Sequence, residues 1–445
     1  MNDKGPATAD APKKPMTVLQ ASFIGVGAMV GAGIFALLGA AGAVAGPAVW
    51  LSFLIAGAIC ALQGYSFARL GSSYPSSGGM LTYLAKGFGE GHITGIVSWL
   101  FYMTGAIVAA MVATSFGGYA SAVVANDNPG WAVAFAVGLV IVMTLLNIVG
   151  STAVARVQSL IVKVVLAILS LFAIVTIMNW DPSLLNPAGY PGLREIISSV
   201  ALTFFAFLGF GVITFTAKDL PHPVRQLPRA IYLALAIATT VYVAVSLGVF
   251  GTLTADQVVE YGATAMAEAA KPTLGQAGYV LMVITALFST AGAVNASLYP
   301  STGMTRHLAE TGQFPRAFGR QIGRRAPVGL VVMALLTIFM ITALDLNSIA
   351  SLGSAVALLI FSAVTASHFK TYRETHASLI VLVVALVATL GTLVVFTMTT
   401  LVDEPKTVIA FVVILSAACL LEFVWTGVRD RGSPRPASGD QADSR

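Results

Sequence analysis

Paired glycines in the middle of two apolar stretches are the feature of this sequence with the clearest chemical consequence. The first stretch holds four glycines within nine residues, Gly25, Gly27, Gly31 and Gly33. Each glycine weakens a helix by about 1 kcal/mol relative to alanine. The Gly27-xxx-Gly31 spacing also suits close packing of two helices through small residues. We favour an unwound segment at Gly31-Ala32-Gly33, because two flexible residues flank a single alanine near the middle of the stretch.

A second stretch has the same arrangement, with Gly209 and Gly211 on either side of Phe210. An interrupted helix leaves free amides at the start of one half-helix and free carbonyls at the end of the other. The amides and the helix dipole can hold a carboxylate without a basic side chain, and the carbonyls can accept hydrogen bonds from an ammonium group. Both together suit a zwitterionic α-amino acid, and glycine-interrupted helices in two halves of a chain are typical of transporter binding sites.

Lys163 is the one Lys or Arg that falls well inside an apolar stretch rather than at its end. Ionisable residues within a membrane are energetically unfavourable and usually functional. A second interpretation is that the side chain extends to the membrane surface, because Lys163 follows Arg156 by about two helical turns. The residues alone leave both interpretations open.

Patterns typical of catalysis or metal binding do not occur elsewhere in the sequence. Neither a His-Glu-x-x-His nor a Gly-x-Ser-x-Gly motif is present, and Cys60 and Cys419 lie in apolar runs without ligand spacing. The five histidines fall in loops or at helix ends: His92, His222, His307, His368 and His376. An intramembrane enzyme is therefore not favoured, and no metal or cofactor is expected.

The elements that must position these residues are membrane-spanning helices. Hydrophobic residues make up 57% of the 445 residues and charged residues only 10%, whereas soluble domains carry about 25% charged residues. A bilayer core of about 30 Å needs roughly 20 apolar residues per helix. Twelve stretches meet this requirement: 17–44, 48–70, 93–121, 131–151, 157–179, 193–216, 229–251, 276–303, 327–344, 349–368, 377–400 and 405–427. We therefore predict an all-α integral membrane protein.

The basic residues indicate how these spans are oriented. With the N-terminus in the cytoplasm, 20 of the 24 Lys and Arg residues fall on the inner side, and Arg194, Lys271 and Lys406 fall on the outer side. This bias follows the positive-inside rule and places both termini in the cytoplasm of a bacterial-type cell. Because the basic residues lie in loops between apolar spans, the net charge of +5 does not indicate nucleic-acid binding.

Four segments outside the spans have distinct compositions. Residues 1–16 and 428–445 are predicted to be cytoplasmic tails, the second of them disordered. Residues 304–326 form a basic inner loop, and residues 252–275 form a helical or extended outer loop.

Five motifs between residues 16 and 375 point to a known superfamily. They are Gly31-Ala-Gly-Ile-Phe35; Arg69-Leu-Gly-Ser-Ser-Tyr-Pro-Ser-Ser-Gly-Gly79 with Tyr83 and Phe88-Gly89; Asn147-x-x-Gly150 with Gln158 and Lys163; Phe204-Phe-Ala-Phe-Leu-Gly-Phe210 through Pro223 and Pro228-Arg-Ala230; and Arg306 through Gly312 and Pro315. Together they resemble the amino acid–polyamine–organocation transporters. The resemblance implies a leucine-transporter-type fold, in which residues 17–179 and 193–368 form a five-plus-five inverted repeat and residues 377–427 add two helices.

The same resemblance places a substrate site at the two interruptions. Backbone atoms would bind a substrate carboxylate at Gly31, Ala32, Gly33 and Ile34, and its ammonium group at Ala28, Met29 and Phe204. Phe205 matches an aromatic position that covers substrate in relatives, although it equally suits ordinary packing. Phe207 and Gly209 of the same motif complete the predicted site.

Lys163 matches a fifth-helix lysine that lies near the broken first helix in several proton-driven relatives. Sodium-coupled relatives place an ion there, so the resemblance implies coupling to protons rather than to sodium. On this hypothesis, protonated Lys163 donates to carbonyls near Gly25 and Val26 and so holds one conformation.

Three positions depart from the superfamily pattern. Gly211 stands where an acidic residue is frequent, Lys218-Asp219 stands where a pair of acids is frequent, and His222 stands where Asn is frequent. The first departure leaves the sixth span without a carboxylate. The change at Lys218 bears on gating rather than on binding.

The substrate class follows from the charges that the spans lack. No Asp or Glu lies in the middle of a predicted span, and Glu422 is near the cytoplasmic end of the last one. A cationic amino acid or polyamine would usually need a buried acid or a cation–π cage, and glutamate would need a second cation. We therefore expect a small or apolar neutral amino acid. Ser115, Asn295 and Ser354 are candidate contacts, although each suits a polar contact between helices better than a contact with substrate.

Several rival functions stay open at this point. An exchanger and a polyamine or cationic amino acid permease belong to the same class as the favoured symporter. A channel is a different class, and it is disfavoured because no filter-like segment is repeated in the sequence. Oligomeric state cannot be assigned from these residues.

Overall fold

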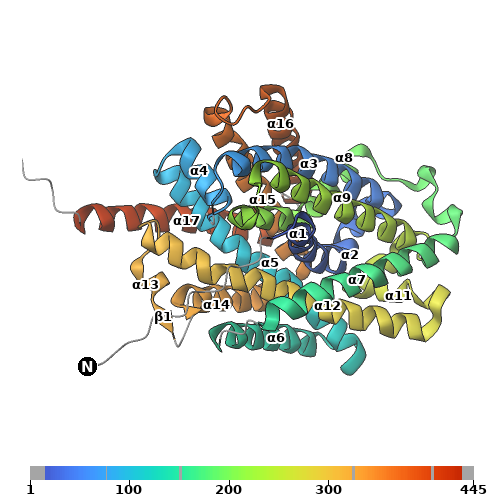
Figure 1. Cartoon of the computed structure of the whole chain (residues 1–445). Helices are drawn as coiled ribbons and strands as arrows, with labels where there is room; N and C mark the ends of the chain where they lie inside the picture. Colours follow the sequence, from blue (N-terminus) through green and yellow to red (C-terminus); the bar gives the residue numbers. More distant parts are fainter. Residues whose placement is uncertain (1–15, 77, 150–152, 323–325, 402–404, 433–445) are drawn as a thin grey trace, which may run out of the picture.

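A computed structural model describes residues 16–76, 78–149, 153–322, 326–401 and 405–432 of the chain. Helices dominate these residues, and the strands found there are a two-stranded antiparallel pair, β1 (Gln321–Ile322) with β2 (Ala326–Pro327). Figure 1 shows the helices packed as one bundle, with α16 and α6 at opposite edges and α1 and α2 near the centre.

The first half of the chain folds into these helices: α1 (Val18–Ala32), α2 (Ile34–Ala45), η1 (Gly46–Ala48), α3 (Val49–Ser73), α4 (Met80–Phe88), α5 (His92–Val124), α6 (Pro129–Val149), α7 (Ala153–Met178), η2 (Pro182–Leu185), η3 (Pro187–Gly189), α8 (Leu193–Phe205) and η4 (Leu208–Asp219). The second half forms the remaining helices: α9 (Pro223–Phe250), α10 (Ala255–Tyr261), η5 (Gly262–Thr264), α11 (Ala265–Glu268), α12 (Lys271–Glu310), α13 (Arg316–Gly319), α14 (Val328–Ala343), α15 (Leu346–Thr371), α16 (Leu379–Phe396), η6 (Thr397–Leu401) and α17 (Pro405–Gly432).

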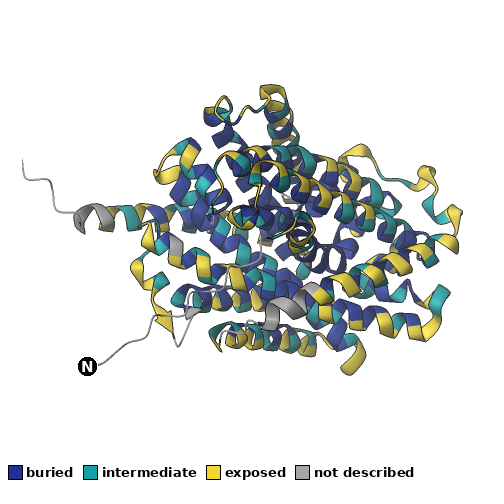
Figure 2. Ribbon diagram, viewed as in Figure 1, coloured by how far each residue is buried: buried dark blue, intermediate teal, exposed yellow. Residues whose placement is uncertain are grey.

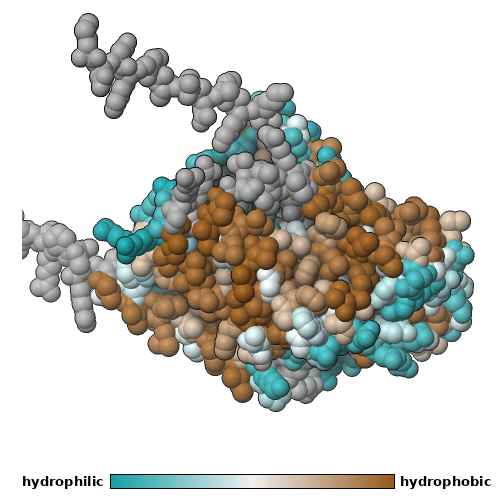
Figure 3. All heavy atoms as spheres, turned by 90° about the horizontal axis from the view of Figure 1, so that it is seen from below, coloured by the Kyte–Doolittle hydropathy of each residue, from teal (hydrophilic) through white to brown (hydrophobic). Residues whose placement is uncertain are grey.

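The helices have the length and composition of membrane spans. In the described part of the chain, ten are long and apolar enough to cross a bilayer, and Val18–Gly31 and Val328–Ala343 are shorter apolar helices. Each of the twelve predicted stretches overlaps one of these helices. Figure 3 shows hydrophobic side chains over the middle of one face, with hydrophilic residues gathered toward two opposite ends. An all-α membrane protein is thus confirmed.

Burial separates inner helices from outer ones. In the most apolar part of α15, 83% of the residues are buried, whereas in α6 and α17 the share is 22%. The span that contains α8 and η4 is buried to the same 83%. Figure 2 shows the same division, with dark blue residues concentrated in the middle of the bundle. The interrupted sixth span therefore lies inside the protein, where irregular backbone can be tolerated.

Several segments differ from the predicted boundaries. The helix α4 lies between two of the predicted spans, outside any predicted helix. The loop 252–275, predicted to be helical or extended, contains α10, η5 and α11. The helix α12 includes a non-helical Gly275 with φ of 63° and continues to Glu310, seven residues beyond the predicted end of its span at residue 303. The last helix continues to Gly432, so the predicted tail begins as helix. Residues 1–15 and 433–445 lie outside the described residues.

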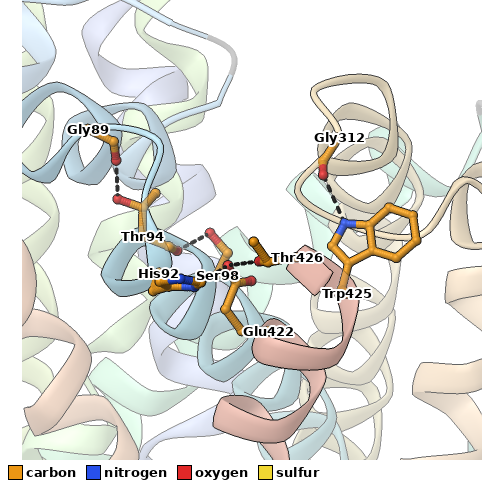
Figure 4. Close-up of polar contacts among 8 residues, drawn as sticks. All are labelled: Gly89, His92, Thr94, Ser98, Gly312, Glu422, Trp425 and Thr426. Carbon is orange, nitrogen blue, oxygen red and sulfur yellow. Dashed lines mark hydrogen bonds and ion pairs between the residues drawn. The ribbon is translucent and has the colours of Figure 1, made fainter. Parts of the chain in front are cut away.

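Polar contacts near one end of α17 join this last helix to α5 and to the segment after α12 (Figure 4). The Thr426 hydroxyl donates to Glu422 Oε1 over 3.0 Å, and His92 Nδ1 lies 3.6 Å from the same oxygen. The Trp425 indole donates to the Gly312 carbonyl over 2.9 Å. These bonds fix a helix that is otherwise largely peripheral.

Candidate functional site

The first interruption is confined to Gly33. The helix α1 ends at Ala32 and α2 begins at Ile34, with Gly33 at φ −82° and ψ −72° between them. The Gly33 amide donates to the Met29 carbonyl over 2.7 Å, and the Gly33 carbonyl accepts from Leu37 over 2.9 Å. The break is therefore narrower than the predicted unwinding over Gly31-Ala32-Gly33. Because α2 starts anew at Ile34, amides of its first turn have no partner within α2.

The second interruption lies at Ala206 and Phe207, a few residues before the predicted glycine pair. The Ala206 amide donates to the Thr203 carbonyl over 3.1 Å, and the Phe207 amide donates to Phe204 over 3.0 Å. Both are bonds to the third preceding residue, and the 3₁₀-helix η4 continues this pattern to Asp219. A long 3₁₀ stretch inside a span is unusual and often marks a functional hinge. Our placement of this break at Gly209 to Gly211 was wrong, since both glycines lie inside η4.

Glycine at position 209 serves close approach instead. A Cβ atom built on Gly209 would lie 2.6 Å from the Met29 amide nitrogen and 2.7 Å from the Ala28 carbonyl carbon. Real Cβ atoms essentially never come this close to backbone, so only glycine fits without a shift. The two interrupted spans thus touch through main-chain atoms. Ala28 is half-buried and Met29 is fully buried at this contact.

The first break also faces the second one directly. A Cβ atom on Gly33 would lie 2.8 Å from the Cβ of Ala206 and would overlap the hydroxyl oxygen of Tyr242 on α9. On the neighbouring turn, a Cβ atom on Gly31 would lie 2.7 Å from the Ser289 carbonyl oxygen and 2.7 Å from Ala293 Cβ, both on α12. The breaks are therefore enclosed by α9 and α12.

Three phenylalanines of the sixth span, Phe204, Phe205 and Phe207, lie in the same region, and each is buried. The Phe204 ring meets Phe361 of α15 edge-on, with 5.5 Å between centroids. Phe205 lies directly over Gly353 of α15. Phe207 packs edge-on against Tyr242 at 5.1 Å. Two helices distant in sequence, α9 and α15, thus converge on residues 204–207.

Of the predicted site residues, the structure brings most into one region. Ala28, Met29, Gly31, Gly33, Phe204, Phe205, Phe207 and Gly209 all lie at or beside the two breaks. Ala32 and Ile34 flank Gly33 in the chain, and Ile34 is buried. Whether these residues bind a substrate stays a prediction.

The three candidate side-chain contacts are occupied by protein partners. The Ser115 hydroxyl donates to the Phe35 carbonyl in the first turn of α2 over 3.2 Å. Asn295 Oδ1 accepts from Asn147 of α6 over 2.9 Å. The Ser354 hydroxyl donates to Ala350, one turn earlier on its own helix, over 2.7 Å. In this conformation Ser115 and Asn295 make the polar contacts between helices that were the alternative, whereas Ser354 bonds its own helix.

Lys163 lies beside Phe23, near the start of α1, and not among the residues found at the two breaks. Its side chain is exposed, and its Nζ lies 5.9 Å from the centroid of the Phe23 ring. The neighbouring Val162 instead faces Gly27, where an added Cβ atom would lie 2.6 Å from Val162 Cγ2. A small pocket opens beside this contact, lined by residues of α1, α7 and α12: Gly27, Val30, Gly31, Ile161, Val162, Val165 and Ser289.

Charge is scarce around the breaks. Among the described side chains, the buried ionisable groups of Asp, Glu, His, Lys and Arg are Glu422 and His368. Glu422 lies 3.6 Å from His92, at the first turn of α5. The two ring nitrogens of His368 form hydrogen bonds with Ser66 and Thr375, each at 2.8 Å. No group of three or more His, Cys, Asp or Glu residues within the described chain could hold a metal ion. Among the described residues, the breaks therefore offer backbone groups and neutral side chains.

Sequence reasoning missed Tyr242, Gly353 and Phe361, which contact the breaks from α9 and α15. Of these, only Tyr242 could have been suspected from the sequence, because its hydroxyl lies inside an apolar stretch and must find a hydrogen-bond partner when it is buried.

Inner helices with two adjoining main-chain breaks, in a bundle with an apolar exterior, are typical of membrane transporters. The amino acid permease family matches residues 16–424. The chain is 34% identical to the inner membrane transport protein YbaT of Escherichia coli, over 83% of this chain and 87% of that protein. The chain belongs to the amino acid permease family, within the amino acid–polyamine–organocation superfamily.

Two further relatives come from Bacillus subtilis. The methylthioribose transporter is 27% identical over 69% of each chain. The branched-chain amino acid permease BcaP is 27% identical over 53% of this chain and 54% of its own length. These matches support the predicted superfamily and a role in membrane transport of amino acids.

Proposed function

We propose that this protein is a secondary active transporter that moves a neutral amino acid across the cytoplasmic membrane by alternating access. The observation that carries the proposal is the contact between the two interrupted spans, where Gly209 meets the backbone of Ala28 and Met29, and Gly33 meets Ala206. Two half-helix ends are thereby held side by side in the buried centre of the bundle.

The substrate's polar head would bind at these ends. The start of α2 at Ile34 offers amides and the positive end of a helix dipole to a carboxylate. Near the ends of α1 and α8, the carbonyl oxygens of Met29 and Phe204 each accept a backbone amide, from Gly33 and Phe207, and the second lone pair of each would accept from an ammonium group. Such a site needs no charged side chain, which matches the scarcity of buried charges in the described residues.

The substrate's side chain is expected to be neutral. The side chains described around the breaks are Phe204, Phe205, Phe207, Phe361 and Tyr242. A cationic side chain there would lack a carboxylate and an anionic one would lack a cation, and an unpaired buried charge is strongly unfavourable. The name of the relative BcaP supports an apolar neutral amino acid.

The topology proposed for this mechanism has twelve spans with both termini in the cytoplasm. Residues 17–179 and 193–368 would form the two inverted halves, each starting with an interrupted span, and residues 377–427 would add two helices. The support is the position of the breaks in the first and sixth predicted spans, together with the bias of basic residues toward one side.

Coupling is proposed to use a proton and Lys163. In the conformation described, the Lys163 Nζ lies 5.9 Å from the centroid of the Phe23 ring, and no hydrogen bond from it to Gly25 or Val26 is formed among the described residues. The proposal therefore requires a rotamer change that brings its Nζ toward α1 in another state of the cycle. A small pocket lies between α1 and α7 beside Gly27 and Val162, and its lining contains Ser289 as the one hydroxyl side chain.

Uptake by purified protein in liposomes tests the function. We expect saturable uptake of radiolabelled leucine or alanine, stimulated by unlabelled neutral amino acid inside the vesicles and not inhibited by arginine, glutamate or putrescine. Flux without saturation or counterflow would indicate a channel. Inhibition by arginine or putrescine, with no effect of neutral amino acids, would contradict the substrate class. A thermal-shift screen with the same compounds gives an independent measure, because ligands that bind only the folded state raise its stability.

A further inference from the structure

Tyr242 is the side chain whose hydroxyl contacts both interruptions. It lies on α9, is fully buried, and donates a hydrogen bond over 3.1 Å to the carbonyl oxygen of Ala206, the first residue beyond α8. The same hydroxyl oxygen occupies the place next to Gly33 where a Cβ atom would otherwise project. One phenol group thus contacts the break in the first span and the break in the sixth.

The ring of Tyr242 is held from two sides. Phe207 meets it edge-on at a centroid distance of 5.1 Å, and Phe53 of α3 packs against it at 5.2 Å with an interplanar angle of 56°. Phe207 itself belongs to the second break. The hydroxyl is therefore fixed in direction before any substrate arrives, which is what a group that positions backbone atoms requires.

The bond to Ala206 addresses a specific problem of interrupted membrane helices. Where the α-helical pattern stops, carbonyl groups lose their regular partners, and an unsatisfied carbonyl at membrane depth costs several kcal/mol. Tyr242 supplies a donor from a neighbouring helix at the point where α8 ends. The arrangement also explains the glycine at position 33, because any larger residue would collide with the hydroxyl and with Ala206.

We propose that Tyr242 is a positioning residue, which holds the Ala206 carbonyl and sets the spacing between the two breaks. It thereby fixes the geometry of the half-helix ends that bind the substrate's carboxylate and ammonium groups. This inference rests on the proposed function for its effect on transport, whereas its effect on the backbone does not depend on any substrate.

Tyr242→Phe tests the inference because it removes the hydroxyl and keeps the ring. For uptake in liposomes we expect the KM to rise by about two- to tenfold, as for the loss of one hydrogen bond, with Vmax changed less than about twofold. Tyr102→Phe is the matched control, since Tyr102 is also buried and donates to a backbone carbonyl, Gly329, over 2.5 Å. An unchanged KM for Tyr242→Phe, or an equal rise for Tyr102→Phe, would overturn the assignment.

Hydrogen exchange of the purified protein supplies a measurement that needs no substrate. We expect Tyr242→Phe to speed amide exchange in peptides that cover residues 31–37 and 204–210, and Tyr102→Phe to leave these peptides unchanged. Exchange that stays at the wild-type rate in both segments would overturn the inference even if transport is altered. If the wild type transports no amino acid, the proposed function fails, and the exchange result still decides the role of Tyr242.

A double substitution gives a further check through Gly33. Gly33→Ala should impair uptake, and combining it with Tyr242→Phe should restore part of the lost activity, because one of the atoms that the new methyl group meets is the removed oxygen. Losses that simply multiply in the double variant would show that the two residues are not coupled and would contradict the proposal.

Discussion

Gly209 and Met29 are packed so closely that a Cβ atom on residue 209 would lie 2.6 Å from the Met29 amide nitrogen. The contact joins η4 of one interrupted span to α1 of the other through main-chain atoms of Ala28 and Met29 and the Cβ of Ala28. Helix-forming propensity would favour alanine over glycine by about 1 kcal/mol. Packing opposes that preference here, so glycine marks a steric requirement at this position.

Gly209→Ala is therefore expected to reduce transport strongly. Inserting a methyl group into a closely packed contact typically costs about 1–3 kcal/mol, and the atoms met here are backbone, which cannot turn away. Gly138→Ala on α6 is the control, because a Cβ atom there would meet nothing within 4 Å. We expect at least a roughly tenfold loss of uptake for Gly209→Ala at equal protein level, and none for Gly138→Ala. Wild-type uptake by Gly209→Ala would show that the two spans need not touch.

Gly353→Ala should change substrate preference through Phe205. The ring of Phe205 lies in the space that a Cβ atom on residue 353 would occupy, so the added methyl group must push the ring toward the breaks. We expect uptake of leucine to fall about tenfold more than uptake of alanine, in line with the effect of one or two methylenes in an apolar pocket. Competition assays with a series of neutral amino acids measure this. Combining the change with Phe205→Leu should restore leucine uptake, whereas an equal loss for every substrate would contradict a role in selectivity.

Lys163→Gln should uncouple uptake from the pH gradient. If the charge on Lys163 stabilises one conformation, its removal leaves counterflow intact and abolishes the stimulation by an inward proton gradient. Lys370→Gln serves as the control, because Lys370 likewise lies over an aromatic ring, Phe88, at 5.2 Å from its centroid. Uptake by Lys163→Gln that still responds to the gradient as the wild type does would end the coupling hypothesis.

The positions of the helices followed from local properties of the sequence. Apolar length and glycine content set where a span lies and where it is weak, and both are visible within about 20 residues. The first break was accordingly found next to Gly33. The second was misplaced because glycine has two uses, flexibility and close approach. At Gly209 the neighbour is the Met29 backbone, and at Gly211 it is Met80, whose Cε would lie 3.0 Å from an added Cβ.

Side-chain partners across the bundle could not be read in the same way. Gly353 was not identified because the need for glycine there comes from contact with the Phe205 ring, and Phe205 is far away in the sequence. Lys163 was identified by its charge, but the direction of its side chain depends on the rotation of α7, which directs Val162 toward Gly27 instead. Tyr242 carried a weak signal, a hydroxyl in an apolar stretch, without any indication of which carbonyl it bonds. Tertiary packing decides these relationships, and no local pattern encodes them.

The Asn147–Asn295 pair should contribute measurably to stability. The Asn147 amide donates to Asn295 over 2.9 Å and so joins α6 to α12. Polar bonds between membrane helices average about 0.6 kcal/mol and reach about 1.7 kcal/mol in double-mutant cycles. We expect a coupling energy in this range between Asn147→Ala and Asn295→Ala, measured by thermal or chemical unfolding in detergent. Additive effects of the two substitutions would mean that the bond is not formed.

Glu422 should anchor the last helix more strongly than an exposed acid would. Its carboxyl group occupies the space that a Cβ atom on Gly95 of α5 would take. It accepts a hydrogen bond from Thr426 over 3.0 Å, and the residue is only 6% exposed. A hydrogen-bonded buried carboxylate contributes about 1.5–3 kcal/mol, whereas an exposed ion pair contributes about 0–1 kcal/mol.

Glu422→Ala is accordingly expected to lower the unfolding temperature more than Glu310→Ala, which removes an exposed acid paired with Arg306 at 2.9 Å. The KM for substrate should stay at its wild-type value, because the bonds of Glu422 lie at the first turn of α5 and not at the breaks (Figure 4). The unfolding temperatures of the two variants, measured in the same detergent, decide the comparison. Equal values would show that this carboxylate does not hold α17 to α5, and a changed KM would show that the last helix reaches the substrate site through α5.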